Sequence, residues 1–213
     1  MRTNLPPYVC PNLVARVAIL ALCFTGLISQ ALAQQITVAV VDSARVPAGT
    51  RASAEQEAGR ILKSAGISVK WVDVTIPADV PANDIVLQIV PEAGPMRDPR
   101  TMGAALAADE GGIYASIFFD RVCQRAANPL SNDAHVELAP LMGHAIAHEI
   151  GHLLLGTNSH SSNGLMSALW RAGDLRRMGK GQFNFQPGEA AKMQSEVKRR
   201  TSGKPQAATA EAR

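Results

Sequence analysis

The stretch from His135 to Leu155 carries the longest helical pattern in the chain, and it constrains the fold more than any other stretch. Its apolar residues recur at helical spacing and form one stripe, of which Leu141 and Ile146 are members. Within it, His148 and His152 lie four positions apart. Residues four apart project from successive turns on one face of a helix, so these two imidazoles can bind the same metal ion.

Glu149 gives this pair a chemical role, because it completes the motif HExxH. Its carboxylate cannot share the histidines' coordination position, but it can reach a water on the metal, where a general base for hydrolysis must lie. The motif is short and occurs by chance in helices, so the residues that follow it matter. Gly156 is a residue that stops helices, and His160 is a third imidazole. A turn at Gly164-Leu165-Met166 comes shortly after.

Together these residues resemble the metzincin superfamily of zinc peptidases, and most closely its matrixin-like arrangement. The resemblance implies one catalytic zinc ion with three histidine ligands, which are His148, His152 and His160. It also implies that Glu149 activates the attacking water, that Gly156 lets the chain turn, and that Met166 lies in a methionine turn beneath the metal. The implied reaction is peptide hydrolysis without a covalent intermediate.

The spacing to the third histidine departs from the metzincin pattern. In HExxHxxGxxH the glycine and third histidine lie closer to the second histidine than Gly156 and His160 do, because this chain has one added residue in each interval. Strict counting puts Asn158 in the third position, but a carboxamide is a poorer zinc ligand than an imidazole. One alternative is a gluzincin-like peptidase whose third ligand is a carboxylate such as Asp174 or Glu189. Another is a non-catalytic, zinc-stabilised binding module, which would not need a base.

The remaining patterns predict an α+β fold, with a mixed sheet packed with helices. The resemblance makes this a metzincin-like zinc peptidase domain with an active-site helix and a C-terminal helix. Runs rich in β-branched and aromatic residues predict strands at Ile36–Val41, Ile67–Val74, Asp84–Val90 and Gly111–Val122. Besides the helix that carries HExxH, helical periodicity predicts helices at Ser53–Ser64 and Pro187–Lys198.

The strand from Gly111 to Phe119 precedes the active-site helix, as in the metzincin layout. It is either an edge strand that binds extended substrate or a plain core strand. Tyr114 on it either stabilises an oxyanion or packs. The segment from Pro91 to Glu110 is expected to be a long surface loop with one helical turn around Ala104 to Ala107, and Ala168 to Phe185 is a variable region.

Residues 1–33 are expected to be a signal peptide. Arg2 and Arg16 are their only charges, the apolar run is shorter than the roughly 20 residues that span a bilayer, and Ala31-Leu32-Ala33 offers a cleavage site. The mature protein is then secreted or periplasmic, with no stable membrane anchor after cleavage. Its peptidase-like domain is expected at residues 34–200, and residues 201–213 are expected to be a disordered tail.

Composition narrows the possible partners. The formal net charge is +3, it falls close to neutral without residues 1–33, and no basic patch is interleaved with aromatic residues, so nucleic acid is not an expected partner. Cys123 is the only cysteine after residue 33, which excludes an internal disulfide. His144 is not expected to bind the metal, since eight helical residues put it about 12 Å from His152. His135 is not expected to bind it either, because it is expected to be a loop residue. The expected protein is a monomeric zinc metalloendopeptidase acting on protein or peptide substrates.

Overall fold

Five strands form one mixed sheet, and five helices accompany it, in the part of the chain that the computed structural model describes, residues 34–75, 81, 84–94, 98, 100–107, 112–128 and 135–202. The strands are β1 (Gln34–Asp42), β2 (Ile67–Asp73), β3 (Ile85–Val90), β4 (Gly103–Ala105) and β5 (Tyr114–Phe118). The helices are α2 (Ala48–Ser64), α3 (Phe119–Ala127), α4 (Leu138–Leu155), α5 (Ala172–Gly179) and α6 (Pro187–Ser202). The predicted mixed sheet packed with helices is confirmed. The predicted signal peptide, and residues 203–213 of the predicted tail, lie outside the described residues.

The strand order in the sheet is β2-β1-β3-β5-β4. β1 pairs in parallel with both β2 and β3, and β3 pairs in parallel with β5. Parallel neighbours need a crossover, and α2 provides it between β1 and β2. Among the described strands, only β4 runs antiparallel to its neighbour, β5, and it ends the described sheet on that side.

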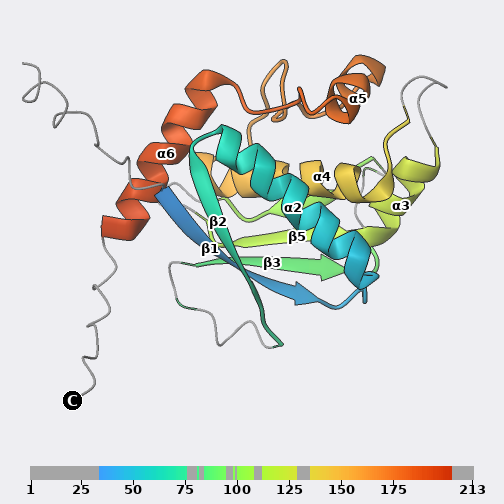
Figure 1. The fold of residues 1–213 in the computed structure, drawn as a ribbon, viewed down its shortest axis with the longest axis horizontal. Helices are drawn as coiled ribbons and strands as arrows, with labels where there is room; N and C mark the ends of the chain where they lie inside the picture. The colour runs from blue at the N-terminus through green and yellow to red at the C-terminus, as the bar shows by residue number, and fades with distance from the viewer. Residues whose placement is uncertain are drawn as a thin grey trace, which may run out of the picture. The chain divides into compact units, whose positions relative to one another are not determined.

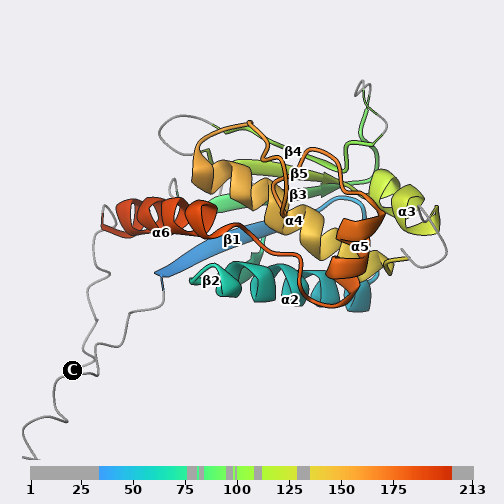
Figure 2. The same cartoon turned by 90° about the horizontal axis from the view of Figure 1, so that it is seen from above.

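Helices α2 and α4 lie side by side over one face of the sheet (Figures 1 and 2). The side chains of β1 show why the sheet accepts this cover. Ile36, Val38 and Val40 alternate along the strand and are buried in the core. Of the residues between them, Thr37 is half-buried and the small Ala39 is buried. α6 packs on α4 and on β1, so the C-terminal helix closes the core beside the HExxH helix.

Gly143 lets α2 and α4 approach each other closely. A β-carbon at this position would lie 2.7 Å from the Ala54 carbonyl oxygen and 2.8 Å from the Glu57 β-carbon. Any larger residue would push the two helices apart. Because α4 is buried almost throughout, its position relative to the sheet is fixed by packing rather than by its own helical propensity.

Of the two expectations for Gly111 to Phe119, the core strand is confirmed and the edge strand is wrong. β5 lies inside the sheet, because β4 covers its outer side, and β4 is the edge (Figure 2). The helical turn predicted around Ala104 to Ala107 is also wrong, since Gly103–Ala105 is this edge strand. A Gly-Ala-Ala segment has no strand pattern of its own, and its conformation comes from pairing with β5.

Two helices were not predicted. α3 starts directly at the end of β5, where the sequence suggests a continuing strand and then a polar connection, and α5 occupies part of the variable region. α2 begins at Ala48, five residues before its predicted start, and α6 extends to Ser202. Within the described ranges, no helix combines the length and hydrophobicity that crossing a membrane requires.

Candidate metal centre

Helix α4 ends where the sequence predicts. Gly156 caps it with φ at 65°, a left-handed conformation that costs glycine little and other residues more. The N–H groups of Gly156 and Thr157 both donate to the carbonyl oxygen of His152. The chain thus leaves the helix within one turn of its second histidine, and the segment that carries His160 begins there.

The three predicted histidines come together. The Nε2 atoms of His148 and His152 are 3.0 Å apart, and one ring nitrogen from each of His148, His152 and His160 lies within 4.8 Å of the others. The ring of His160 is 4.9 Å from that of His152, centroid to centroid. His148 and His152 are buried, and His160 is exposed. The longer interval after His152 therefore still returns the third imidazole to the pair.

The two carboxylates considered as rival ligands do not join this cluster. Asp174 accepts hydrogen bonds from the backbone N–H of Arg171 and from the Arg177 side chain. Glu189 accepts from the backbone N–H of Gln186, and its other oxygen pairs with the Ser161 hydroxyl. Among the described residues, the three histidines are the group whose ligand atoms converge.

In His148 and His152, the hydrogen bond made by Nδ1 determines which ring nitrogen is left free to bind a metal ion. Nδ1 of His148 lies 2.8 Å from the Leu165 carbonyl oxygen, and Nδ1 of His152 lies 2.8 Å from that of Thr157. A carbonyl can only accept, so both Nδ1 atoms carry the proton and both Nε2 atoms present lone pairs. Burial lowers the pKa of both rings, that of His148 to about 3, so both are neutral near pH 7. Two facing lone pairs repel each other unless a cation lies between them.

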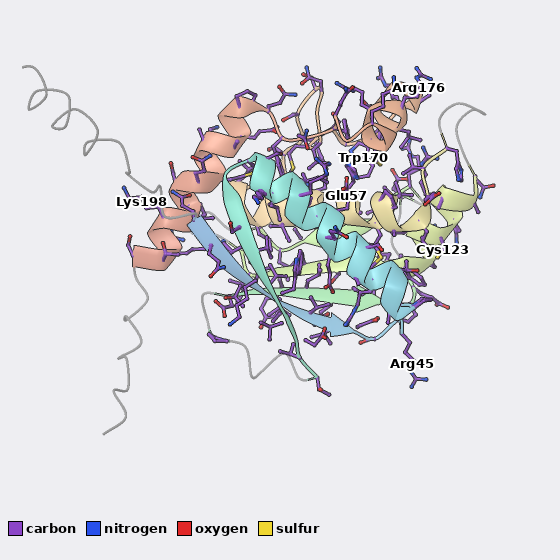
Figure 3. The ribbon with its side chains drawn as sticks, viewed as in Figure 1. Arg45, Glu57, Cys123, Trp170, Arg176 and Lys198 are labelled. Atoms are coloured by element: carbon purple, nitrogen blue, oxygen red, sulfur yellow. The ribbon has the colours of Figure 1, made fainter. Side chains whose placement is uncertain are left out.

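The carbonyl of Leu165 has a second donor, which the sequence did not reveal. Trp170 Nε1 donates to it at 3.1 Å, and the Trp170 ring meets the His148 ring edge-on with centroids 5.7 Å apart. Trp170 is labelled in Figure 3. Hydrogen-bond partners of this kind orient a metal-binding imidazole, so Trp170 is placed to hold His148.

Met166 packs against α4 at Gly151, the residue before His152. A β-carbon at Gly151 would lie 2.6 Å from Met166 Sδ and 2.7 Å from a ring carbon of Phe185. Met166 is buried, and its carbonyl oxygen accepts from the backbone N–H of Ser161. Met166 therefore packs on the helix that carries His148 and His152, at the position of Gly151. A glycine inside a helix costs about 1 kcal/mol, and the close approach of Met166 and Phe185 accounts for glycine at position 151.

Glu149 lies between α4 and the edge strand. A β-carbon at Gly103 of β4 would be 2.7 Å from Glu149 Cγ and 2.8 Å from its Oε1, so the missing side chain of Gly103 makes room for the carboxylate. Glu149 is 7% exposed, and burial raises its pKa to about 8. A carboxyl group in such a place can take or give a proton near neutral pH.

The three histidines, Glu149, Gly103 and Trp170 line one cavity of about 910 Å³. Its walls come from β4, the end of α3, the histidine face of α4 and the segment 167–172. Asn158 also lines it, whereas Tyr114 does not and is 40% exposed, which separates Tyr114 from the site. His144 is fully buried, with Nδ1 2.8 Å from the Pro140 carbonyl oxygen, and it does not join the cluster.

Comparisons with known proteins give only distant likenesses. No protein-family model matches the chain, and no curated protein matches it. The chain is similar to the crystal structure of archaemetzincin from Methanopyrus kandleri, with 17% identity over 78% of this chain and 97% of that one, at a TM-score of 0.48. It is also similar to a zinc-dependent peptidase from Methanocorpusculum labreanum, with 16% identity over 74% of this chain and 99% of that one, at a TM-score of 0.45. Likenesses this distant carry no chemistry over to this chain, so its function must be argued from its own residues.

Proposed function

We propose that the protein is a zinc-dependent peptidase in which His148, His152 and His160 bind one zinc ion and Glu149 is the general base. The observation that carries this proposal is the 3.0 Å distance between the Nε2 atoms of His148 and His152, with a ring nitrogen of His160 within 4.8 Å of the pair. Neutral imidazoles are preferred zinc ligands, and three of them leave a coordination position open. When bound there, zinc supplies a Lewis acid that polarises a substrate carbonyl and lowers the pKa of a water.

The residues of the chain supply the rest of the reaction. Glu149 lies beside His148 in the wall of the cavity, where its carboxylate can take a proton from the attacking water and return it to the leaving amine. The hydrogen bonds from Nδ1 of His148 and His152 hold those rings with Nε2 facing inward.

Among the described residues, no strand pairs with the side of β4 that faces away from β5, and this side offers a place for extended substrate. Leu106 and Phe118 donate to Tyr114 and Met102 across the β4–β5 pair, so the backbone groups that alternate with these bonds, at Gly103 and Ala105, point away from β5. Both residues line the cavity. A peptide added to this edge would have its backbone beside Glu149, which supports cleavage within extended peptides.

A non-catalytic zinc module is the weaker candidate. A structural zinc site closes its fourth position with another protein ligand, whereas this trio opens onto a cavity that also contains a buried carboxyl group. Export of the protein also remains a proposal, and it rests on the sequence of residues 1–33. Protein or peptide substrates and a monomeric state likewise stay predictions.

The matched pair of wild type and Glu149→Gln tests the function. Both proteins should bind about one zinc per chain by plasma mass spectrometry, because Glu149 is not a ligand. Cleavage of an unfolded, fluorescently labelled casein should fall at least 100-fold in the variant, the range expected for loss of a general base. Equal cleavage by the two proteins, or a zinc-loaded wild type without activity, would refute the assignment.

A further inference from the structure

One wall of the cavity carries an arginine with an unused donor. Arg125, on α3, lines the cavity beside Asn128. Its Nη1 donates to the Asn128 carbonyl oxygen at 2.9 Å, which satisfies the C-terminus of its own helix. Its Nη2 is buried, and no residue that the structure describes accepts a hydrogen bond from it. A buried donor without an acceptor is costly, and few native groups are left so.

Within the described ranges, no acidic side chain forms an ion pair that neutralises the positive charge of Arg125. Arg100, which also lines the cavity, is held by Asp98 through two side-chain hydrogen bonds, of 2.9 and 3.1 Å. No such ion pair joins Arg125 to an acidic side chain among the residues described. Burial lowers the pKa of Arg125, but a guanidinium stays charged at neutral pH. Arg125 is half-buried, so the cavity presents a partly desolvated positive charge to whatever enters it.

The direction of β4 indicates which part of a substrate would meet this charge. Phe118 donates to the Met102 carbonyl oxygen at 2.9 Å, and α3 begins at the next residue, so α3 lies at the Met102 end of β4. An extended peptide pairing antiparallel with β4 would run from Ala105 towards Gly103, and its C-terminal part would approach Met102 and α3.

We propose that Arg125 binds a carboxylate of the substrate on the C-terminal side of the scissile bond. The inference rests on the proposed peptidase function, and it adds a substrate class to it. A carboxylate accepts from a guanidinium in a bidentate or charge-assisted manner, which would satisfy Nη2. The carboxylate can belong to an acidic side chain or to the C-terminus of the peptide, and both are distinguished below.

The substrates that test this are internally quenched peptides in matched pairs. In the first series, one Glu or one Gln occupies each of the three positions after the cleaved bond, and the C-terminus is amidated. In the second series the peptides carry no acidic residue and differ only in a free or an amidated C-terminus. Mass spectrometry locates the cleaved bond. We expect the zinc-loaded wild type to favour the carboxylate member of at least one pair by about ten-fold or more in kcat/KM.

Two substitutions of Arg125 test whether the preference for the carboxylate peptide depends on its guanidinium group. Arg125→Met should reduce the ratio between the paired peptides to near one, and Arg125→Lys should retain part of it, because the charge remains without the fork. Arg176→Met is the matched control, since Arg176 is exposed on α5 (Figure 3) and is not among the residues that line the cavity. This variant should keep the wild-type ratio. Zinc content and circular dichroism verify that each variant is folded and loaded.

Binding separates failure of this inference from failure of the proposed function. The same peptide pairs are titrated calorimetrically into zinc-loaded Glu149→Gln and into the double variant that also carries Arg125→Met. A carboxylate preference that requires Arg125 supports the inference even if the wild type cleaves nothing, in which case the peptidase function alone is wrong. Equal binding and equal cleavage of the paired peptides would overturn the role of Arg125, whether or not the protein is a peptidase.

Discussion

At the residue scale, the backbone carbonyl oxygen of Leu165 holds two side chains of the site. Leu165 accepts from Nδ1 of His148 and from Nε1 of Trp170, at 2.8 and 3.1 Å. The first bond orients a histidine of the centre, and the second fixes the acceptor of that bond. The position of His148 therefore depends on Trp170 as well as on α4.

Trp170→Phe should weaken zinc binding, because phenylalanine keeps an aromatic ring against His148 but cannot donate to Leu165. Loss of a partner that orients a metal ligand directly costs about 10- to 100-fold in metal affinity. Trp170 acts on His148 through the Leu165 carbonyl, so we expect the zinc affinity to fall by up to about ten-fold. Competition with a chromophoric chelator measures the affinity. Trp71→Phe is the control, since Trp71 lies on β2 away from the site. Equal affinities of the two variants would show that Trp170 has no role in holding His148.

Gly103 tests the position of the proposed base without touching a ligand. A β-carbon there would meet both Glu149 and the Ser116 carbonyl oxygen, at 2.8 Å from the latter, so Gly103→Ala must displace the carboxylate or the strand. We expect at least a ten-fold loss of kcat with zinc content unchanged, and a loss of stability of about 1–3 kcal/mol. In Gly49→Ala the new β-carbon meets nothing within 4 Å, so this control should keep full activity. Unchanged kcat in Gly103→Ala would mean that Glu149 does not act from its place beside β4.

At the scale of elements, sequence patterns were sufficient wherever an element carries its own signal. The strands β1 and β3 and the helix α4 match their predicted positions because β-branched runs and a long apolar stripe are local properties. β4 has no such signal, since a three-residue strand of glycine and alanine exists only through its pairing with β5. That pairing also places β5 inside the sheet, which leaves the core-strand alternative for Gly111 to Phe119 and makes β4 the strand proposed to bind substrate.

Arg200 anchors the C-terminal helix to the helix of the site. It is 7% exposed, and its Nη2 donates to the carbonyl oxygens of Gly112, at 2.9 Å, and Leu153, at 3.2 Å. Its Nε pairs with Glu196 at 2.8 Å. α6 thereby holds the last turns of α4 and the segment that leads into β5.

Arg200→Met should lower the free energy of unfolding by roughly 2–4 kcal/mol, because two buried carbonyls and one partly buried carboxylate lose their charged donor. Arg199→Met, at the neighbouring and exposed position, should cost less than about 1 kcal/mol, although Arg199 also pairs with Glu196. Urea denaturation of the two variants measures both values. A cost for Arg200→Met no larger than that for Arg199→Met would contradict the anchoring role.

At the scale of the whole molecule, the site is assembled from segments far apart in the sequence. His148, His152 and Glu149 come from one helix, and a local motif was enough to find them. Gly103, Arg125 and Trp170 come from β4, α3 and the segment before α5, and only the fold brings them to the same cavity. No sequence pattern marks a glycine that makes room for a carboxylate, or a tryptophan that shares a carbonyl, because both depend on contacts between distant segments.

For the third metal ligand, the sequence left several candidates, and the structure shows which of them lies beside the histidine pair. The interval from His152 to His160 left Asn158, Asp174 and Glu189 as alternatives, since spacing alone does not say where a loop returns. The fold returns His160 to the histidine pair, while the two carboxylates are engaged in hydrogen bonds elsewhere.

X-ray absorption spectroscopy at the zinc edge of the loaded full chain tests the proposed centre most directly. We expect three imidazole nitrogens at about 2.0–2.1 Å and one further light ligand. His160→Ala should remove one imidazole from the spectrum, while Asn158→Ala, Asp174→Asn and Glu189→Gln should leave it unchanged. A spectrum that is unaffected by His160→Ala, or that loses a ligand in one of the other three variants, would contradict the proposed three-histidine centre.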